Sequence, residues 1–197
     1  LFLPLSFIVL EFYFLRDVVP VSTVRGAMNA LALAAMYFCL FGPMNSVGSE
    51  GRAISLLETL PISPSEILWK KTLFWGLIAE ICFLPVAAGT GVYLAFPDQD
   101  IAFLTAWMGL IIFGFVWIAI RLSAIFPHFE AKVLQKSSTM EGKLLGPLIM
   151  SVGIAAKRAH PQDILCGLCF ISLAYSLHLK AVEVMRTRND ADSRRTP

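Results

Sequence analysis

Charged residues are scarce in this sequence. Only 15% of its 197 residues are Asp, Glu, Lys or Arg, whereas 57% are hydrophobic. A water-soluble domain of this length usually carries about a quarter charged residues. Several of the apolar runs approach the roughly 20 residues that a helix needs to cross a bilayer. The composition therefore predicts an all-α, polytopic membrane helix bundle, and a net charge of +2 gives no reason to expect a nucleic-acid partner.

Motifs for catalysis and nucleotide binding are also missing. The chain has no G-x-x-x-x-G-K-[ST] loop and no G-x-S-x-G, and Glu141-Gly142-Lys143 is the nearest fragment of a phosphate loop. The histidines, His128, His160 and His178, are far apart and not at metal-ligand spacing. We therefore expect no enzymatic chemistry, no metal and no cofactor bound by this chain.

The four cysteines all fall inside apolar runs. Cys166 and Cys169 are about one helical turn apart, but zinc needs about four ligands and redox chemistry needs polar access. We interpret all four, Cys39, Cys82, Cys166 and Cys169, as small packing residues.

The apolar runs predict about six transmembrane helices within one domain, residues 1–182, followed by a polar tail over residues 183–197. The predicted spans are 1–15, 26–47, 72–96, 101–126, 144–156 and 164–179. The first run is short and the chain does not begin with Met, so we expect that an N-terminal part is missing. The fifth run is either a short, tilted span or a re-entrant hairpin.

Smaller signals mark the ends of these helices. Gly42-Pro43 predicts a kink near the end of the second span, and Pro85 is a kink point within the third. Residues 97–100 predict a tight acidic turn before the fourth span. The tail from Lys180 onward is polar, and we expect it to be frayed.

The distribution of Lys and Arg predicts the orientation of the chain, because cytosolic loops are enriched in both. Eleven lie in the 49–71 loop, the 127–143 loop and the tail: Arg52, Lys70, Lys71, Lys132, Lys136, Lys143, Lys180, Arg186, Arg188, Arg194 and Arg195. Four lie on the opposite side: Arg16, Arg25, Lys157 and Arg158. The bias places both loops and the C-terminus in the cytosol, as expected for a multi-pass protein of the bacterial inner membrane.

The 49–71 loop carries its own helix signals. Ile54, Leu57 and Leu60 recur at helical spacing, so residues 50–60 predict a short amphipathic helix that Pro61 ends. Residues 63–66, Ser-Pro-Ser-Glu, then form a capping box with proline at the first helical position. The sequence predicts a short interfacial helix, an elbow and the start of the third span.

Two charges are predicted within the hydrocarbon region, where an unpaired charge costs several kcal/mol. Glu80 lies about nine residues past Lys71, roughly 13 Å in, and Arg121 lies about six residues before Pro127, roughly 9 Å from the same side. One hypothesis is a Glu80–Arg121 pair that faces the bundle interior. The alternative is that Arg121 extends to the headgroups while Glu80 is protonated or bonds locally.

The 49–71 loop resembles the cytosolic loop of ABC-2 type permeases, the transmembrane subunits of ATP-binding-cassette exporters. The residues that carry the resemblance are Glu50-Gly51-Arg52, Leu56-Leu57, Leu60-Pro61-Ile62-Ser63-Pro64 and Lys70-Lys71. The later Phe126-Pro127-His128-Phe129-Glu130 is similar to a Phe-Pro-x-Phe-Asp/Glu loop of larger, two-part exporters in this group. The resemblance implies the C-terminal half of a larger exporter or an N-terminally truncated subunit.

The resemblance also implies roles for individual residues. In that family the helix after the second span is a coupling helix, which docks on a separate ATPase subunit that holds ATP and Mg. Carried over to this chain, the docking residues are Glu50, Arg52, Leu56, Leu57, Glu58 and Leu60, and the elbow residues are Pro61, Ser63, Pro64 and Glu66. A second permease half or a homodimer would complete the translocation path.

Two functions follow from these features. The first is a permease subunit that couples ATP hydrolysis on a partner chain to substrate export. The second is a non-transporting membrane anchor or assembly protein whose 49–71 loop recruits a soluble partner. A helix of two to three turns is not stable alone in water, so both functions require a surface for residues 50–60. The bilayer surface is a third location, although the helix lacks the basic bias that an anionic membrane attracts.

Overall fold

The computed structural model describes residues 23–47, 63–126, 139–155 and 161–193, and all of its regular elements there are helical. The helices are α2 (Val24–Phe41), the 3-10 turn η1 (Pro43–Asn45), α4 (Pro64–Tyr93), α5 (Asp98–Ile125), α6 (Met140–Ala155) and α7 (Pro161–Ser193). Three helical segments are long and apolar enough to cross a membrane: Val24–Asn45, Pro64–Tyr93 and Asp98–Ile125. The prediction of an all-helical fold is confirmed for the described residues, three of whose helical segments could span a membrane by length and composition. The predicted span 1–15 lies outside the described residues.

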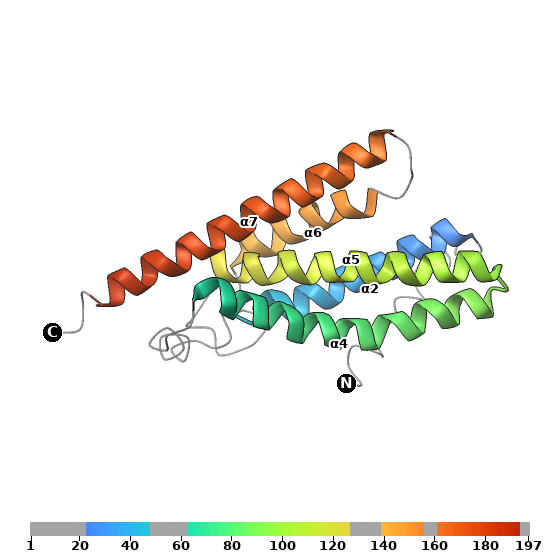
Figure 1. The fold of residues 1–197 in the computed structure, drawn as a ribbon, viewed down its shortest axis with the longest axis horizontal. Coiled ribbons are helices and arrows are strands. Elements are labelled where there is room, and N and C mark those ends of the chain that lie inside the picture. The colour runs from blue at the N-terminus through green and yellow to red at the C-terminus, as the bar shows by residue number, and fades with distance from the viewer. Residues whose placement is uncertain (1–22, 48–62, 127–138, 156–160, 194–197) are drawn as a thin grey trace.

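Helix α5 is the centre of the bundle, since it packs against α2, α4, α6 and α7. Figure 1 shows α4 and α5 as antiparallel neighbours, with α6 and α7 forming a second antiparallel pair. The C-terminal third of α5 is almost wholly buried, from Phe115 to Ala124 apart from Trp117. On α2, alanines fill the buried face, which allows its close approach to neighbouring helices.

Helix α4 begins where the capping box predicts. The Ser63 hydroxyl accepts a hydrogen bond from the Glu66 backbone N–H at 3.2 Å, and Pro64 is the first helical residue. The Glu66 carboxylate pairs with Lys70 at 2.9 Å, one turn further along. The start of α4 therefore has a capped N–H and an acidic first turn, both of which stabilise a helix N-terminus.

Helix α2 is shorter than the predicted span 26–47, because it ends at Gly42-Pro43 instead of bending there. The Asn45 side-chain amide donates to the carbonyls of Leu40 and Phe41 at 2.7 and 3.2 Å. These carbonyls belong to the last turn of α2, and the carbonyls of a last turn accept no hydrogen bond from within the helix. The predicted kink is therefore a helix end, capped from η1.

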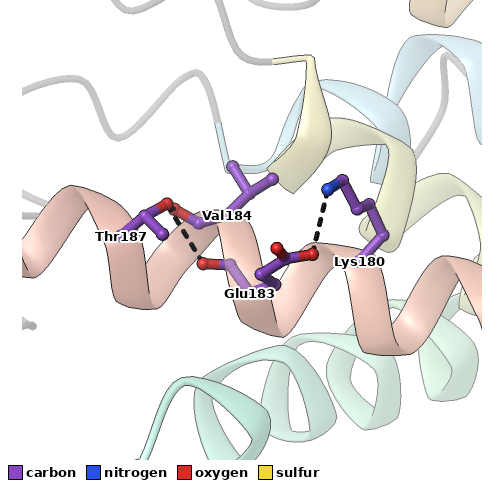
Figure 2. A network of polar contacts seen from close by, with 4 residues as sticks. All are labelled: Lys180, Glu183, Val184 and Thr187. Carbon is purple, nitrogen blue, oxygen red and sulfur yellow. Dashed lines mark hydrogen bonds and ion pairs between the residues drawn. The ribbon is translucent and has the colours of Figure 1, made fainter.

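Two polar stretches that we expected to be non-helical belong to helices. In the predicted acidic turn at residues 97–100, Pro97 is the N-cap of α5, and Asp98 and Asp100 lie in its first turn, where they complement the helix dipole. The predicted polar tail continues α7 as far as Ser193. Figure 2 shows the local support for α7: Lys180 pairs with Glu183 at 2.9 Å, and the Thr187 hydroxyl donates to the carbonyls of Glu183 and Val184. The prediction of fraying from Lys180 was wrong for these residues, since i, i+3 pairs and helix-forming side chains sustain the helix.

The turn between α4 and α5 brings two backbones close together. The Phe96 N–H donates to the Gly91 carbonyl at 3.0 Å, and Ala95 has a φ of 53°, the left-handed conformation that closes many helix ends. Gly91 faces the first turn of α5, and a Cβ at this position would lie 2.8 Å from Ile101 Cγ1. The absence of a side chain at Gly91 thus allows the end of α4 to lie close to the first turn of α5.

We expect Gly91→Ala to destabilise the protein by about 1–3 kcal/mol, because the stiff Ile101 side chain must move to admit the methyl group. Gly89→Ala is the matched control on the same helix, since no atom lies within 4 Å of its built Cβ. Alanine there should be neutral or slightly stabilising. Thermal unfolding of both variants in the same detergent measures the difference, and equal melting temperatures would show that the contact with Ile101 does not limit the packing.

Candidate functional site

One end of the bundle gathers the described residues that border the predicted cytosolic loops. Figure 1 shows the end of η1, the start of α4, the end of α5 and the start of α6 at this same end. The Val47 N–H donates to the Ser123 hydroxyl of α5 at 3.0 Å, and the Lys71 ammonium donates to the Ser46 carbonyl at 3.4 Å. The Thr139 N–H donates to the Phe126 carbonyl at 3.0 Å. The residues that flank 48–62 (Val47 and Ser63) and those that flank 127–138 (Phe126 and Thr139) therefore all lie at this end of the bundle.

The predicted docking residues lie in the first of these two segments, outside the described residues. They are Glu50, Arg52, Leu56, Leu57, Glu58 and Leu60, together with the elbow residue Pro61. The remaining elbow residues, Ser63, Pro64 and Glu66, form the capped start of α4 described above. Only the last residues of the predicted elbow are therefore described by the structure, as the start of α4. The docking surface itself stays a prediction.

Arg121 of α5 is fully buried at this end of the bundle. One of its terminal nitrogens, Nη1, donates to the Thr72 hydroxyl of α4 and lies 3.4 Å from the Trp117 carbonyl. The guanidinium carbon lies 3.6 Å from the centroid of the Trp117 ring, which is a cation–π distance. The Thr72 hydroxyl donates in turn to the Leu68 carbonyl at 2.8 Å, so its lone pairs are directed to Arg121.

The structure does not bring Glu80 and Arg121 together. The register of α4 against α5 is set by three contacts besides Thr72–Arg121: Gly76 against Phe113, Leu84 against Gly109, and Gly91 against Ile101.

Glu80 lies between the contacts at Gly76 and Leu84, so it is level with the residues between Gly109 and Phe113. It is also eight residues from Thr72, about 12 Å along the helix. The hypothetical charge pair is therefore not formed in this structure, and among the described residues Arg121 has no acidic partner.

The Trp117 ring that contacts the guanidinium is itself packed against Trp69 and His178. The Trp69 ring of α4 meets the Trp117 ring edge-on, with centroids 5.2 Å apart. The His178 ring of α7 lies 5.6 Å from the Trp117 ring, and its Nε2 is 3.5 Å from the Ser65 hydroxyl of α4. Helices α4, α5 and α7 thus meet around one buried cation, and we call these six residues the arginine cluster: Ser65, Trp69, Thr72, Trp117, Arg121 and His178.

Sequence reasoning found only Arg121 of this cluster. Helical spacing could have indicated two further members. Trp117 is four residues before Arg121 and Trp69 is three before Thr72, so each pair lies on one helix face. His178 carried no such signal, since its position depends on how α7 packs against α5. We treated it as one of three isolated histidines.

Three polar nitrogens in the arginine cluster have no hydrogen-bond partner among the described residues. They are Nε and Nη2 of Arg121 and Nδ1 of His178, and all three are buried. The two arginine atoms form one edge of the guanidinium, from which parallel N–H groups can bind a carboxylate or a phosphate in two-pronged fashion. The cluster therefore has the chemistry to bind an anion. Its Ser65 hydroxyl and His178 Nε2 lie 3.5 Å apart, but among the described residues no carboxylate accepts from His178 Nδ1, so the pair does not form a catalytic triad.

Metal chemistry finds no support in the part of the chain that the structure describes, since no group of three His, Cys, Asp or Glu side chains gathers there. Cys39 and Cys82 are buried thiols within apolar surroundings. Their positions agree with the interpretation of cysteine as a packing residue.

Comparison with known proteins gives no assignment. No protein-family model matches the chain, no curated protein is similar to it, and no solved structure resembles it.

Proposed function

We propose that the chain is the permease subunit of an ATP-binding-cassette exporter, which transmits the energy of ATP hydrolysis on a separate, Mg-ATP-binding subunit. The observation that carries the proposal is the 49–71 segment, whose residues resemble a coupling helix and its elbow. The described ends of this segment support it. Val47 is hydrogen-bonded to α5, and Ser63 caps α4, so a displacement of residues 48–62 acts on both sides of the α4–α5 pair.

In this proposal the transmembrane domain has six spans, with both loops and the C-terminus in the cytosol. Two features beyond the three long apolar helices support this number. The predicted sixth span falls within α7, which carries exposed apolar side chains at Ile171, Leu173, Tyr175 and Leu179. Surfaces of this kind are stable in contact with lipid. Helix α6 runs antiparallel to α7, as two consecutive spans require (Figure 1).

In this mechanism the start of α4 acts as a lever that moves the whole helix. Ser63, Pro64 and the ion pair between Glu66 and Lys70 make the first turns of α4 a stable helix, so a push at the elbow tilts α4 as a body. Tight packing at Gly76 and Gly91 then passes the tilt to α5. Lys70 and Lys71, near the start of α4, mark the level of the headgroups.

The test is co-purification with the ATPase. We expect Leu57→Asp/Leu60→Asp to lower the amount of bound P-loop ATPase at least tenfold, because two carboxylates would remove the apolar face of residues 50–60. Leu57→Met/Leu60→Met is the matched control, since it keeps that face and should retain the ATPase. The purified complexes are compared by quantitative mass spectrometry and by the rate of ATP hydrolysis. If the ATPase remains bound to the aspartate variant at full activity, residues 50–60 are not its docking site.

A further inference from the structure

The free edge of Arg121 lacks a counter-charge. Nη1 donates to Thr72 and Trp117, but Nε and Nη2 have no hydrogen-bond partner in the part of the chain that the structure describes, although the side chain is fully buried. A buried guanidinium that is only partly hydrogen-bonded is costly, and buried charges in proteins are normally paired. The described residues supply no carboxylate here, so the ligand that fits this edge is an anion from outside the described chain.

The position of Arg121 along α5 indicates which kind of anion can reach it. It lies four residues before the end of α5 at Ile125, about 6 Å from the helix end. Trp69 and Trp117 lie at the same level, and tryptophan gathers where the hydrocarbon meets the headgroups. Trp69 is 42% exposed, so the outer side of the cluster faces the surroundings of the bundle. Phosphate is the anion that a bilayer presents at this depth.

From these observations we propose that the arginine cluster is a phosphate-binding site, in which the Nε–Nη2 edge of Arg121 grips two phosphate oxygens and α7 closes the site through His178. His178 contributes the third unpartnered nitrogen, Nδ1, and it packs against the same Trp117 ring that stacks on the guanidinium. In the closed arrangement Arg121 is covered, so His178 and Trp117 turn aside when phosphate enters. The expected source is a membrane phospholipid. The inference is independent of transport and of the ATPase.

Tryptophan fluorescence tests the site, because Trp117 contacts both Arg121 and His178. The full-length protein is purified in dodecyl maltoside, which has no phosphate, and titrated with dihexanoyl phosphatidylglycerol, with dihexanoylglycerol and with sodium phosphate. We expect a saturable change in emission with the phospholipid and none with dihexanoylglycerol, which has the same chains without the phosphate. The change should disappear in Trp117→Phe, which shows that it reports this site.

Variants of the cation then decide whether Arg121 binds the phosphate. Arg121→Gln should weaken phospholipid binding at least tenfold, and Arg121→Lys should weaken it as well, because an ammonium keeps the charge and the fold but has no two-pronged edge. Arg25→Gln, at the opposite end of the bundle, is the control and should bind like the unchanged protein. A saturable response to sodium phosphate at similar concentration would retain the site and assign it to soluble phosphate. Equal binding by the unchanged protein and Arg121→Lys, or an equal response to dihexanoylglycerol, would overturn the proposal.

Discussion

Replacing Thr72 by valine is expected to destabilise the protein by about 2 kcal/mol, although the two side chains have nearly the same shape. Among the described residues, Thr72 is the one whose side chain accepts from Arg121, and hydrogen bonds to charged groups contribute about 1.5–3 kcal/mol. Valine would leave Nη1 with only the Trp117 carbonyl at 3.4 Å, within a fully buried site. Titration with SDS in mixed micelles measures the free energy of unfolding.

Removing the buried charge of Arg121 is expected to have the opposite effect on stability. Arg121→Met keeps a long side chain of similar volume and removes the buried charge, so we expect stability in phosphate-free detergent to be unchanged or higher by about 1–2 kcal/mol. In the Arg121→Met background, Thr72→Val should then cost less than about 0.5 kcal/mol, because no donor remains to be satisfied. If Thr72→Val costs the same in both backgrounds, the hydroxyl does not act through Arg121, and the cation is stabilised in another way.

The local features of the fold were readable from the sequence because they depend on neighbouring residues. The Ser63–Glu66 hydrogen bond and the proline at the first position of α4 both follow from a few adjacent side chains. The length of α7 was misjudged for the complementary reason. Its polar residues suggested fraying, whereas the Lys180–Glu183 pair and the Thr187 bonds act between successive turns, a spacing that a count of polar residues does not capture.

The partner of Arg121 was not predictable, because it depends on the register between two helices. Counting inward from Lys71 and Pro127 placed Glu80 and Arg121 within about 4 Å of the same depth. The actual register includes the turn at the other end of the hairpin, where Gly91 meets Ile101 and Ala95 adopts a left-handed conformation. In this register Thr72 lies opposite Arg121, and Glu80 lies two turns further along α4. No feature near either charge in the sequence reports on that turn.

The two sides of α4 differ in how closely their aromatic side chains are packed. Phe83 is fully buried and meets Phe38 of α2 edge-on, with centroids 5.8 Å apart. Phe74, on the same helix, is 60% exposed. In lipid there is little gain from moving an apolar side chain out of the solvent, so the contribution of a buried residue comes from close packing.

We therefore expect Phe83→Ala to destabilise the protein by roughly 2–4 kcal/mol, because the cavity left between α2 and α4 removes dispersion contacts that neighbouring side chains cannot replace. Phe74→Ala is the matched control and should cost less than about 0.5 kcal/mol, since lipid or detergent chains fill the space on the exposed side. SDS titration of both variants compares the two free energies of unfolding. Similar losses would mean that Phe74 is also covered, and hence that this face of α4 packs against protein rather than lipid.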